Sequence, residues 1–441
     1  MLELSPPRKQ KINLSDYDSE HDIQNRIILS DFTPFDLNLI EEIFYSPLKI
    51  SLKKLARSLQ TEEEAILPIL SKLEKTGLLS RQGDAILVDK EMRKYFEFQM
   101  QRFDPEFKPD LEFFQGLLRK VPIHVLPAWY SVPRSSNNIF ESIIEKHFLT
   151  PQMFHRYLMD LSGGDARVQG ILNDVLAAEH FRVSSSDLIA RYNLSRRDFE
   201  EIMIRLEFHF ACCVSYVKED DHWHEIVTPF REWKQYLTFL KETESPPIQA
   251  VHAIVRKDTR DFAFVEDLSL LLQKKTFPAE KADPLIEKLC LVKLAEKIKG
   301  RLSPLPAAEE WLDMTLENRA LYLYRHPLNR ILGYPHLNHL VERHLREAER
   351  SIKRVLHGGW VLFADFIKGI NVSLSEHSVV ALKKTGKHWN YTPPRYSEEE
   401  KELIYAAIFE WLYEAGIVSV GTFKGRDCFC ATPFGRFFFD D

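Results

Sequence analysis

Two cysteines and two histidines come closest to a metal-binding motif in this sequence. Cys212 and Cys213 lie on one predicted strand of a hairpin, and His222 and His224 lie on or near the other. Alternation along a strand places the two histidines on one face, where a cysteine from the opposite strand could join them. Zinc takes four nitrogen or sulfur ligands, but the usual Cys-x-x-Cys spacing is absent. We therefore expect packed thiols and surface histidines here, and no metal.

The remaining residues that could do chemistry are also better explained by packing. Cys428 and Cys430 are separated by one residue, so both should face the same side of the last strand as small buried hydrophobic groups. The sequence contains no G-x-x-x-x-G-K-[ST], G-x-S-x-G or H-E-x-x-H motif, and no G-x-G-x-x-G follows a strand. We expect no catalytic residue and no cofactor, so the protein is predicted not to be an enzyme.

The composition is that of a globular protein of several domains. The chain has 441 residues, which suggests three or four domains. Its net charge of −6 is unlike that of a dedicated nucleic-acid binder, so such binding would need a local basic patch. The odd number of cysteines, five, predicts reduced thiols and a cytoplasmic location. No apolar run approaches the roughly 20 residues of a membrane span, so we expect no membrane partner.

A pattern of helix, turn, helix and hairpin recurs four times along the chain. Three copies end on a hydroxyl residue followed by proline, at Thr228 and Pro229, Ser303 and Pro304, and Thr432 and Pro433. The hydroxyl oxygen can cap a helix and proline fits its first turn, so each pair should end a strand and begin a helix. The predicted fold class is mainly α with small β-hairpins (α+β), in a tandem array of about four similar domains.

These repeats divide the chain into a tail, a connector and four segments. They are a flexible tail (1–33), segment A (34–96), an irregular or helical connector (97–166), segment B (167–245), segment C (246–336) and segment D (337–441), which carries a basic insertion at 373–396. In the connector we expect short helices at 111–118 and 139–148. In segment C we expect helices near 248–255, 265–272 and 279–289.

Segment A carries the clearest family resemblance. Leu52, Leu55 and Ala56, followed later by Gly77 and two leucines, resemble the pattern of the bacterial winged-helix superfamily in its tandem form. The end of segment D, with Cys-Phe-Cys-Ala-Thr-Pro-Phe-Gly-Arg, is similar to the closing wing of bacterial helicase-associated winged-helix domains, although no helicase motor accompanies it. The resemblance implies modules that serve mainly as protein-binding surfaces, and it carries over no catalytic residue.

The outer face of each predicted third helix tests for DNA reading, because a winged helix normally places that helix in the major groove. In segment D the outer face is acidic, with Glu398, Glu399, Glu402, Glu410 and Glu414 opposite the apolar Ile404, Ile408, Trp411 and Ala415. In segment B three arginines nearly cancel four acids. They are Arg196, Arg197 and Arg205 against Asp198, Glu200, Glu201 and Glu207. The third helix of segment A begins with three glutamates. None is predicted to be a recognition helix.

Basic residues gather instead on the predicted first helix of segment D, at 340–357, and in its insertion. They form a candidate patch for an acidic partner or nucleic acid, with the members Arg343, Arg346, Arg350, Lys353, Arg354, Lys383, Lys384 and Lys387. Val341, Leu345, Ala348, Ile352 and Val355 form the opposite, apolar side of the helix. A solvated helix face without any ligand is the competing interpretation.

We therefore predict a non-enzymatic tandem winged-helix scaffold that mediates protein–protein contacts, within a transcription or chromosome-associated assembly. The alternative is a DNA-binding transcriptional regulator that uses the basic patch in the C-terminal segment. Direct binding to several phosphates should weaken steeply with salt, which distinguishes the two hypotheses. The sequence predicts neither the identity of the partner nor the oligomeric state.

Overall fold

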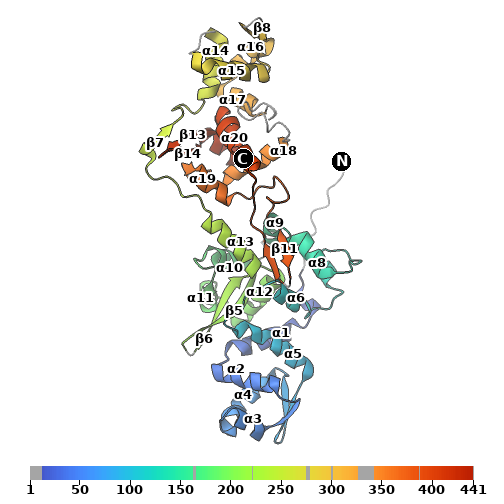
Figure 1. The fold of residues 1–441 in the computed structure, drawn as a ribbon. Coiled ribbons are helices and arrows are strands. Elements are labelled where there is room, and N and C mark those ends of the chain that lie inside the picture. The colour runs from blue at the N-terminus through green and yellow to red at the C-terminus, as the bar shows by residue number, and fades with distance from the viewer. Residues whose placement is uncertain are drawn as a thin grey trace. The chain divides into compact units, whose positions relative to one another are not determined.

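The structure is a computed structural model, and it describes residues 12–161, 165–220, 222–274, 279–298, 301–325, 342–386 and 388–440. The described residues are mainly helical, with antiparallel sheets of two to four strands (Figure 1). The predicted fold class, mainly α with small β-hairpins, is confirmed. Contacts divide the chain into two compact units. Unit 1 comprises Met1–Tyr236 and Ala381–Tyr391, and unit 2 comprises Leu237–Val380 and Thr392–Asp441.

Residues 12–33 do not form the flexible tail that the sequence predicts. The short helix η1 (Leu14–Asp16) leads into α1 (Ser19–Ser30), which packs against other helices of unit 1. Ile23 and Leu29 are buried, and so is the guanidinium of Arg26. The many charges of this stretch favoured a solvated tail, but several of them have partners that lie far away in the sequence.

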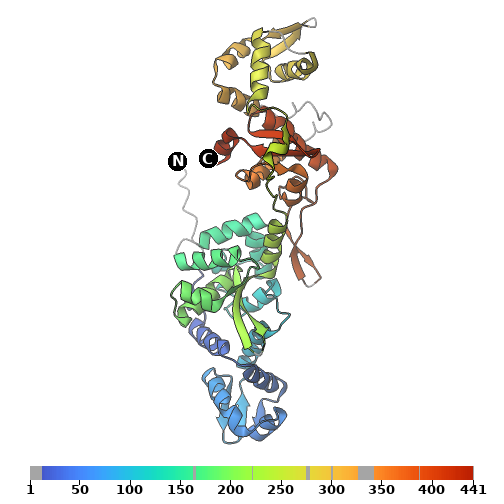
Figure 2. The ribbon, with the colours of Figure 1, turned by 90° about the vertical axis from the view of Figure 1, so that its left-hand side faces the viewer.

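Segment A consists of three helices and a three-stranded sheet, drawn in blue in Figure 2. The elements are α2 (Pro34–Tyr45), β1 (Lys49–Ser51), α3 (Leu52–Ser58), α4 (Glu63–Lys75), β2 (Leu79–Gln82) and β3 (Ala85–Val88). Thr33 and Asp36 form a capping box at the start of α2, and the Ser51 hydroxyl caps α3. Gly77, with φ +76°, ends α4. The sheet order is β1-β3-β2.

The connector is helical and belongs to the core of unit 1. Helix α5 (Lys90–Met100) runs from the end of segment A into the connector. The further elements are η2 (Gln101–Phe103), α6 (Leu111–Leu118), α7 (Leu126–Trp129), α8 (Ile139–Ile143), the π-helical turn η3 (Ile144–Phe148) and α9 (Pro151–Leu161). The helices predicted at 111–118 and 139–148 are confirmed. Phe114 and Phe148 of the connector pack against Phe210 and Phe230 of segment B, which joins the two parts into one aromatic core.

Segment B repeats the arrangement of segment A with a longer hairpin. Its elements are α10 (Ala166–Ala177), β4 (Val183–Ser184), α11 (Ser185–Arg191), α12 (Arg196–Phe208), β5 (Cys212–Glu219), β6 (His222–Pro229) and α13 (Arg231–Glu242). The sheet order is β4-β6-β5. Ser195 and Asp198 form the capping box of α12. The chain passes from unit 1 to unit 2 within α13.

The basic insertion of segment D forms a hairpin that packs as part of unit 1. Strands β11 (Leu382–Thr385) and β12 (His388–Tyr391) pair antiparallel, and Figure 1 draws them in orange beside the green and teal helices. The Leu382 amide donates to the Leu149 carbonyl at 2.7 Å, and the Tyr391 hydroxyl donates to the Phe148 carbonyl at 2.8 Å. The hairpin therefore packs on the connector at residues 148 and 149.

Segment C contributes helices and two hairpin strands to unit 2. They are α14 (Ala263–Lys274), α15 (Ala279–Leu291), β8 (Ala295–Ile298), β9 (Arg301–Pro304), α16 (Pro306–Asp313) and α17 (Leu316–Arg325). The helix predicted near 248–255 is wrong. This stretch holds a single 3-10 turn, η4 (Val251–Ala253), and the strand β7 (Ile254–Arg256), which adds to the sheet of segment D. A short apolar run can form either a helix or a strand, and here the pairing with a strand of segment D, distant in sequence, favours the strand.

Segment D folds around a four-stranded sheet of order β10-β14-β13-β7. Its elements are α18 (Glu342–Arg350), η6 (Ser351–Val355), β10 (Val361–Leu362), α19 (Phe363–Phe366), η7 (Ile367–Gly369), α20 (Glu398–Ala406), the π-helical turn η8 (Ala407–Leu412), β13 (Val418–Phe423), β14 (Arg426–Ala431) and α21 (Pro433–Asp440). A Cβ at Gly421 would lie 2.6 Å from the Val255 carbonyl oxygen. Only glycine therefore lets β7 approach β13 this closely.

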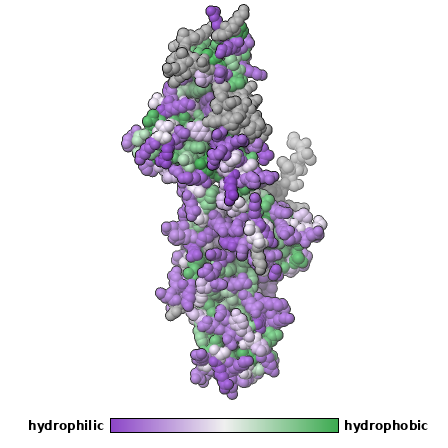
Figure 3. Space-filling model, viewed as in Figure 1, coloured by the Kyte–Doolittle hydropathy of each residue, from purple (hydrophilic) through white to green (hydrophobic). Residues whose placement is uncertain are grey.

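No helix in the described part of the chain combines the length and the apolar character that a membrane span requires. Figure 3 shows hydrophilic side chains over most of the visible face, with hydrophobic residues in small scattered areas.

Candidate interaction surfaces

The third helix of segment B, α12, is covered by α1. Arg26 donates from Nε to Glu200 Oε2 at 2.6 Å and from Nη1 to Glu207 Oε2 at 2.7 Å. Arg102, in η2, donates from Nη1 to Glu207 Oε1 at 2.7 Å and from Nη2 to Oε2 at 2.8 Å. All four side chains are at most 4% exposed. The sequence prediction that places Glu200 and Glu207 on the outer face is therefore wrong, because their partners lie 105 to 181 positions away.

This ion-pair cluster depends on close charge pairing. Burial alone would raise the pKa of the Glu207 carboxyl, but Arg102 and Arg26 together hold that pKa well below its usual range. For Glu200, burial outweighs the attraction of Arg26 and Arg196, so its pKa is raised. On the outer side of α12, Arg196 pairs with Glu225, Arg197 with Glu20 and Arg205 with Glu201. Each of these arginines of α12 therefore forms an ion pair with a carboxylate of the same chain.

The cysteines and histidines of segment B lie at opposite ends of their hairpin. Cys212 and Cys213 pair with Pro229 and Thr228, whereas His222 pairs with Glu219 and His224 with Val217. Both thiols are buried and both histidines are exposed. Burial raises the pKa of both thiols. The structure therefore does not bring these four residues together. Among the residues that it describes, no group of three or more His, Cys, Asp or Glu side chains could hold a metal ion.

The last two cysteines share one side of β14, as the alternation predicts. Cys428 is buried and Cys430 packs against the same small cluster, which contains Ile248, Trp360 and Leu362. Burial raises the pKa of each thiol to about 11. All five cysteines are free thiols. Neither residue has the lowered pKa that marks a reactive cysteine.

Part of the predicted basic patch lies on α18 and η6, but its members differ in role. Arg343, Lys353 and Arg354 are exposed, and the exposed Arg350 pairs with Glu347 at 2.7 Å. Arg346 instead stacks its guanidinium on two rings, 4.6 Å from the centroid of Tyr324 and 5.2 Å from that of Trp411. It also contacts Glu349 at 3.1 Å. Arg346 is therefore part of the packing of unit 2. The apolar side predicted for this helix is buried at Leu345, Ala348, Ile352 and Val355, and Val341 lies outside the described residues.

The other part of the predicted patch belongs to unit 1. Lys383 and Lys384 are exposed on β11, and the Lys384 ammonium lies 5.8 Å from the ring centroid of Trp389. Lys387 lies outside the described residues. The structure thus assigns the predicted set to two compact units.

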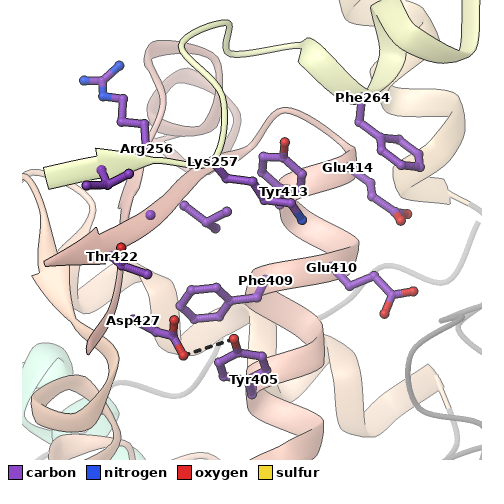
Figure 4. A pocket seen from close by; sticks show the side chains of 13 residues that line it. Arg256, Lys257, Phe264, Tyr405, Phe409, Glu410, Tyr413, Glu414, Thr422 and Asp427 are labelled. Atoms are coloured by element: carbon purple, nitrogen blue, oxygen red, sulfur yellow. Dashed lines mark hydrogen bonds between the residues drawn. The ribbon is translucent and has the colours of Figure 1, made fainter. Parts of the chain in front are cut away.

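A groove of about 630 Å³ runs between the third helix of segment D and the strands β13, β14 and β7 (Figure 4). Tyr405 in α20, Phe409 in η8 and Tyr413 directly after η8 follow one another at intervals of four residues. The rings of Tyr405 and Phe409 stack at 4.3 Å with an angle of 8°. A wide π-helical turn keeps residues four apart nearly in line, and such turns are frequent at functional sites.

Acidic groups border the aromatic row of this groove. Asp427 accepts a hydrogen bond from the Tyr405 hydroxyl at 3.1 Å, and Glu410 and Glu414 project from the helix below Phe264 in Figure 4. Opposite the helix, the Lys257 ammonium lies 4.3 Å from the ring centroid of Tyr413. The lining thus combines rings, carboxylates and two cations, Lys257 and Arg256, each of which already rests on an aromatic ring.

The acidic face predicted for this helix is only partly exposed. Glu398, Glu399 and Glu402 are exposed, but Glu414 is buried and contacts Lys288 of α15 at 2.5 Å. Burial raises the pKa of Glu414 to about 7, and Lys288 opposes this shift. The prediction of an outward-facing Glu414 is wrong, because the third helices of segments C and D meet at this ion pair. The buried face, with Ile404, Ile408, Trp411 and Ala415, is confirmed.

A second cavity, of about 530 Å³, lies in unit 1 between α1, α5 and α6. Asp22, Asn25 and Lys120 are among the residues that line it, and the Lys120 ammonium binds Asp22 at 2.9 Å. Asn25 is 1% exposed, and neither its amide nitrogen nor its amide oxygen has a hydrogen-bond partner. The sequence analysis missed this cavity, because nothing near residue 25 distinguishes a buried amide from a surface one.

The groove could have been found from the sequence. The spacing of Tyr405, Phe409 and Tyr413 places three rings on one helix face, next to the predicted apolar side but not part of it. The neighbouring Lys257 could not have been found, since only the pairing of β7 with β13 brings it there.

No protein family model, curated protein or solved structure matches this chain.

Proposed function

We propose that this protein is a non-enzymatic scaffold of tandem winged-helix modules that binds other proteins, in a transcription or chromosome-associated assembly. In segments A, B and D, helices precede a hairpin whose strands pair in a sheet with a short strand before the second helix, β1, β4 and β10. This order is what the winged-helix resemblance of segment A leads us to expect. It supports the proposal by architecture alone.

One observation supports the proposal most strongly, namely that the third helices of segments B and D form buried ion pairs inside the chain. Glu200 and Glu207 of α12 are buried against Arg26 and Arg102. Glu414, which follows η8, is buried against Lys288 of α15. A helix that enters the major groove must present an open, neutral or basic face to the DNA. Helices α12 and α20 expose carboxylates or are covered by the chain, so these modules are better suited to binding protein than to binding DNA.

The free thiols of all five cysteines agree with a reducing compartment, and we propose a cytoplasmic location on that ground.

DNA binding through the exposed cations of α18 and η6 is the competing function. Arg343, Lys353 and Arg354 are exposed there, which is the observation in its favour. These cations, on two consecutive helices, could contact two or three phosphates. Nonspecific affinity of this kind is weak at physiological salt and falls steeply as salt rises.

A gel-shift titration of the full chain with random duplex DNA tests the proposal. We expect no shift at about 50 mM salt, where phosphate contacts are strongest. A shift that disappears when Arg343 and Lys353 are both changed to Glu would replace the scaffold by the DNA-binding function. Arg346 is left unchanged in this test, because its removal would disturb the packing around Trp411.

A further inference from the structure

We propose that the groove along α20 and η8 binds an arginine or lysine side chain presented by a partner protein. This inference rests on the proposed scaffold function and names the chemistry of its partner. The winged-helix resemblance does not imply this groove, since it is made by an aromatic row on the helix, three acids that differ in exposure and the strand β7.

The chain itself supplies the first argument, because one cation already occupies the row of rings. Lys257 follows β7, its amide donates to the Val420 carbonyl at 3.0 Å, and its ammonium rests 4.3 Å from the centroid of Tyr413. In Figure 4 the Lys257 side chain extends towards Tyr413. Arg256, the other cation of the lining, rests on the ring of Trp360, with its guanidinium 5.2 Å from the ring centroid. Cation–π contact is thus the interaction that this surface uses with its own chain.

The next ring along the helix offers the same chemistry to an outside cation. Phe409 lines the groove with one ring face stacked on Tyr405, and the Asp427 carboxylate lies beside it in Figure 4. The other ring face is the one proposed to receive a cation. A guanidinium can stack on a ring and bind a carboxylate with its edge at the same time. Phe409 and Asp427 present those two partners on neighbouring elements.

The charge of the groove selects the class of ligand. Of the acids that line it, Asp427 is exposed and Glu410 is half-buried, whereas Glu414 is offset by Lys288. Both cations of the lining already rest on rings of the chain, Lys257 on Tyr413 and Arg256 on Trp360, so the carboxylates disfavour a phosphate as the ligand. A stacked nucleobase could use the rings, but its phosphates would be repelled. A basic peptide segment carries no phosphate and would be attracted by the carboxylates.

The groove is held in shape before any partner arrives. Phe409 packs edge-on against Phe363 and Phe429, and Tyr405 packs edge-on against Phe363. On the other wall, β7 is fixed to β13 through residues Ile254–Arg256. Little side-chain freedom is lost on binding, which favours recognition by a small number of contacts.

Fluorescence anisotropy with the full chain tests this inference. The probe is a fluorescein-labelled peptide, Gly-Arg-Gly-Arg-Gly, and the matched control peptide carries citrulline in place of each arginine, which keeps the shape and removes the charge. We expect the arginine peptide to bind at least about fivefold more tightly, because a cation–π contact at a partly exposed site contributes roughly two- to thirtyfold.

Variants locate the binding. Asp427→Asn and Phe409→Leu should each weaken binding of the arginine peptide several-fold, and Phe409→Leu keeps an apolar side chain in the core so that the fold is retained. Glu398→Gln is the control, because Glu398 is an exposed acid on the same helix and does not line the groove. It removes the same charge and should leave binding unchanged.

Equal binding of the two peptides, equal effects of Asp427→Asn and Glu398→Gln, or no binding at about 1 mM peptide would each overturn the inference. A labelled oligothymidine of twelve nucleotides forms a second arm. If it binds and Phe409→Leu abolishes that binding, both the inference and the scaffold proposal fall. If neither peptide nor DNA binds, the groove inference alone falls and the scaffold proposal stands.

Discussion

The buried ion pairs between α1 and α12 should be essential to the stability of unit 1. Changing Arg26 to Met removes the hydrogen bonds to Glu200 at 2.6 Å and to Glu207 at 2.7 and 3.1 Å. Glu207 keeps Arg102, but Glu200 is left with Arg196 alone. Removing one member of a buried pair typically costs about 3–5 kcal/mol, because the remaining charge stays desolvated. We expect a loss in that range.

Hydrogen exchange measured by mass spectrometry suits this variant, because a chain with two compact units need not unfold in one step. Amides of α12 should lose about two to three and a half orders of magnitude of protection in Arg26→Met, whereas amides of unit 2 should keep theirs.

Arg197→Met is the matched control for this prediction. Arg197 joins the same two helices through Glu20, but both side chains are more than half exposed. Solvent screens such a pair, so its loss should leave exchange in α12 almost unchanged. Similar exchange in Arg26→Met and Arg197→Met would refute the reasoning, since burial would then make no difference to the pair.

Three further predictions concern buried polar groups and a glycine. Glu232 is fully buried, and burial raises its pKa to about 7, above the ordinary 4.5. Its protonation therefore stabilises the folded state below pH 4.5, and this contribution is lost as the pH rises through 7. In urea titrations monitored on unit 1, the free energy of unfolding of Glu232→Gln should rise relative to that of the wild type by up to about 3 kcal/mol between pH 5 and pH 8. A difference between the two proteins that stays constant with pH would contradict this. Asn25→Leu should raise the free energy of unfolding by about 1–3 kcal/mol, because it removes two unsatisfied buried atoms; a fall would indicate that the amide has a ligand in solution. Gly421→Val should detach β7 from β13, seen as faster exchange at Val255 while β14 keeps its protection; unchanged exchange at Val255 would show that the strand tolerates a Cβ.

Local signals were sufficient for much of the fold. Ser51 caps α3 and Gly77 ends α4 through local chemistry, and the connector helices at 111–118 and 139–148 follow from their apolar spacing. These features depend on side chains within a few residues of each other, which is the range over which capping and periodicity act.

Features that depend on distant partners could not be predicted in this way. Arg26 looks like a solvated residue in a polar tail until Glu200 is placed against it, 174 positions later. The sequence predicts the end of a helix at residues 254–255, but in the structure residues 254–256 form a strand that pairs with β13. In both cases the tertiary contact overrides the local preference, and a single sequence carries no record of that contact.

The hairpin β11–β12 has a consequence for how the protein can be made. It completes unit 1, with the Tyr391 hydroxyl bonded to the carbonyl of Phe148, 243 positions earlier. A ribosome that has synthesised residues 1–236 has therefore not yet supplied all of that unit. Unit 1 must wait, with the surface around Phe148 uncovered, while more than half of unit 2 is translated. Truncation after residue 236 should leave the same surface open, so a stable fragment will need the hairpin joined back through a short linker.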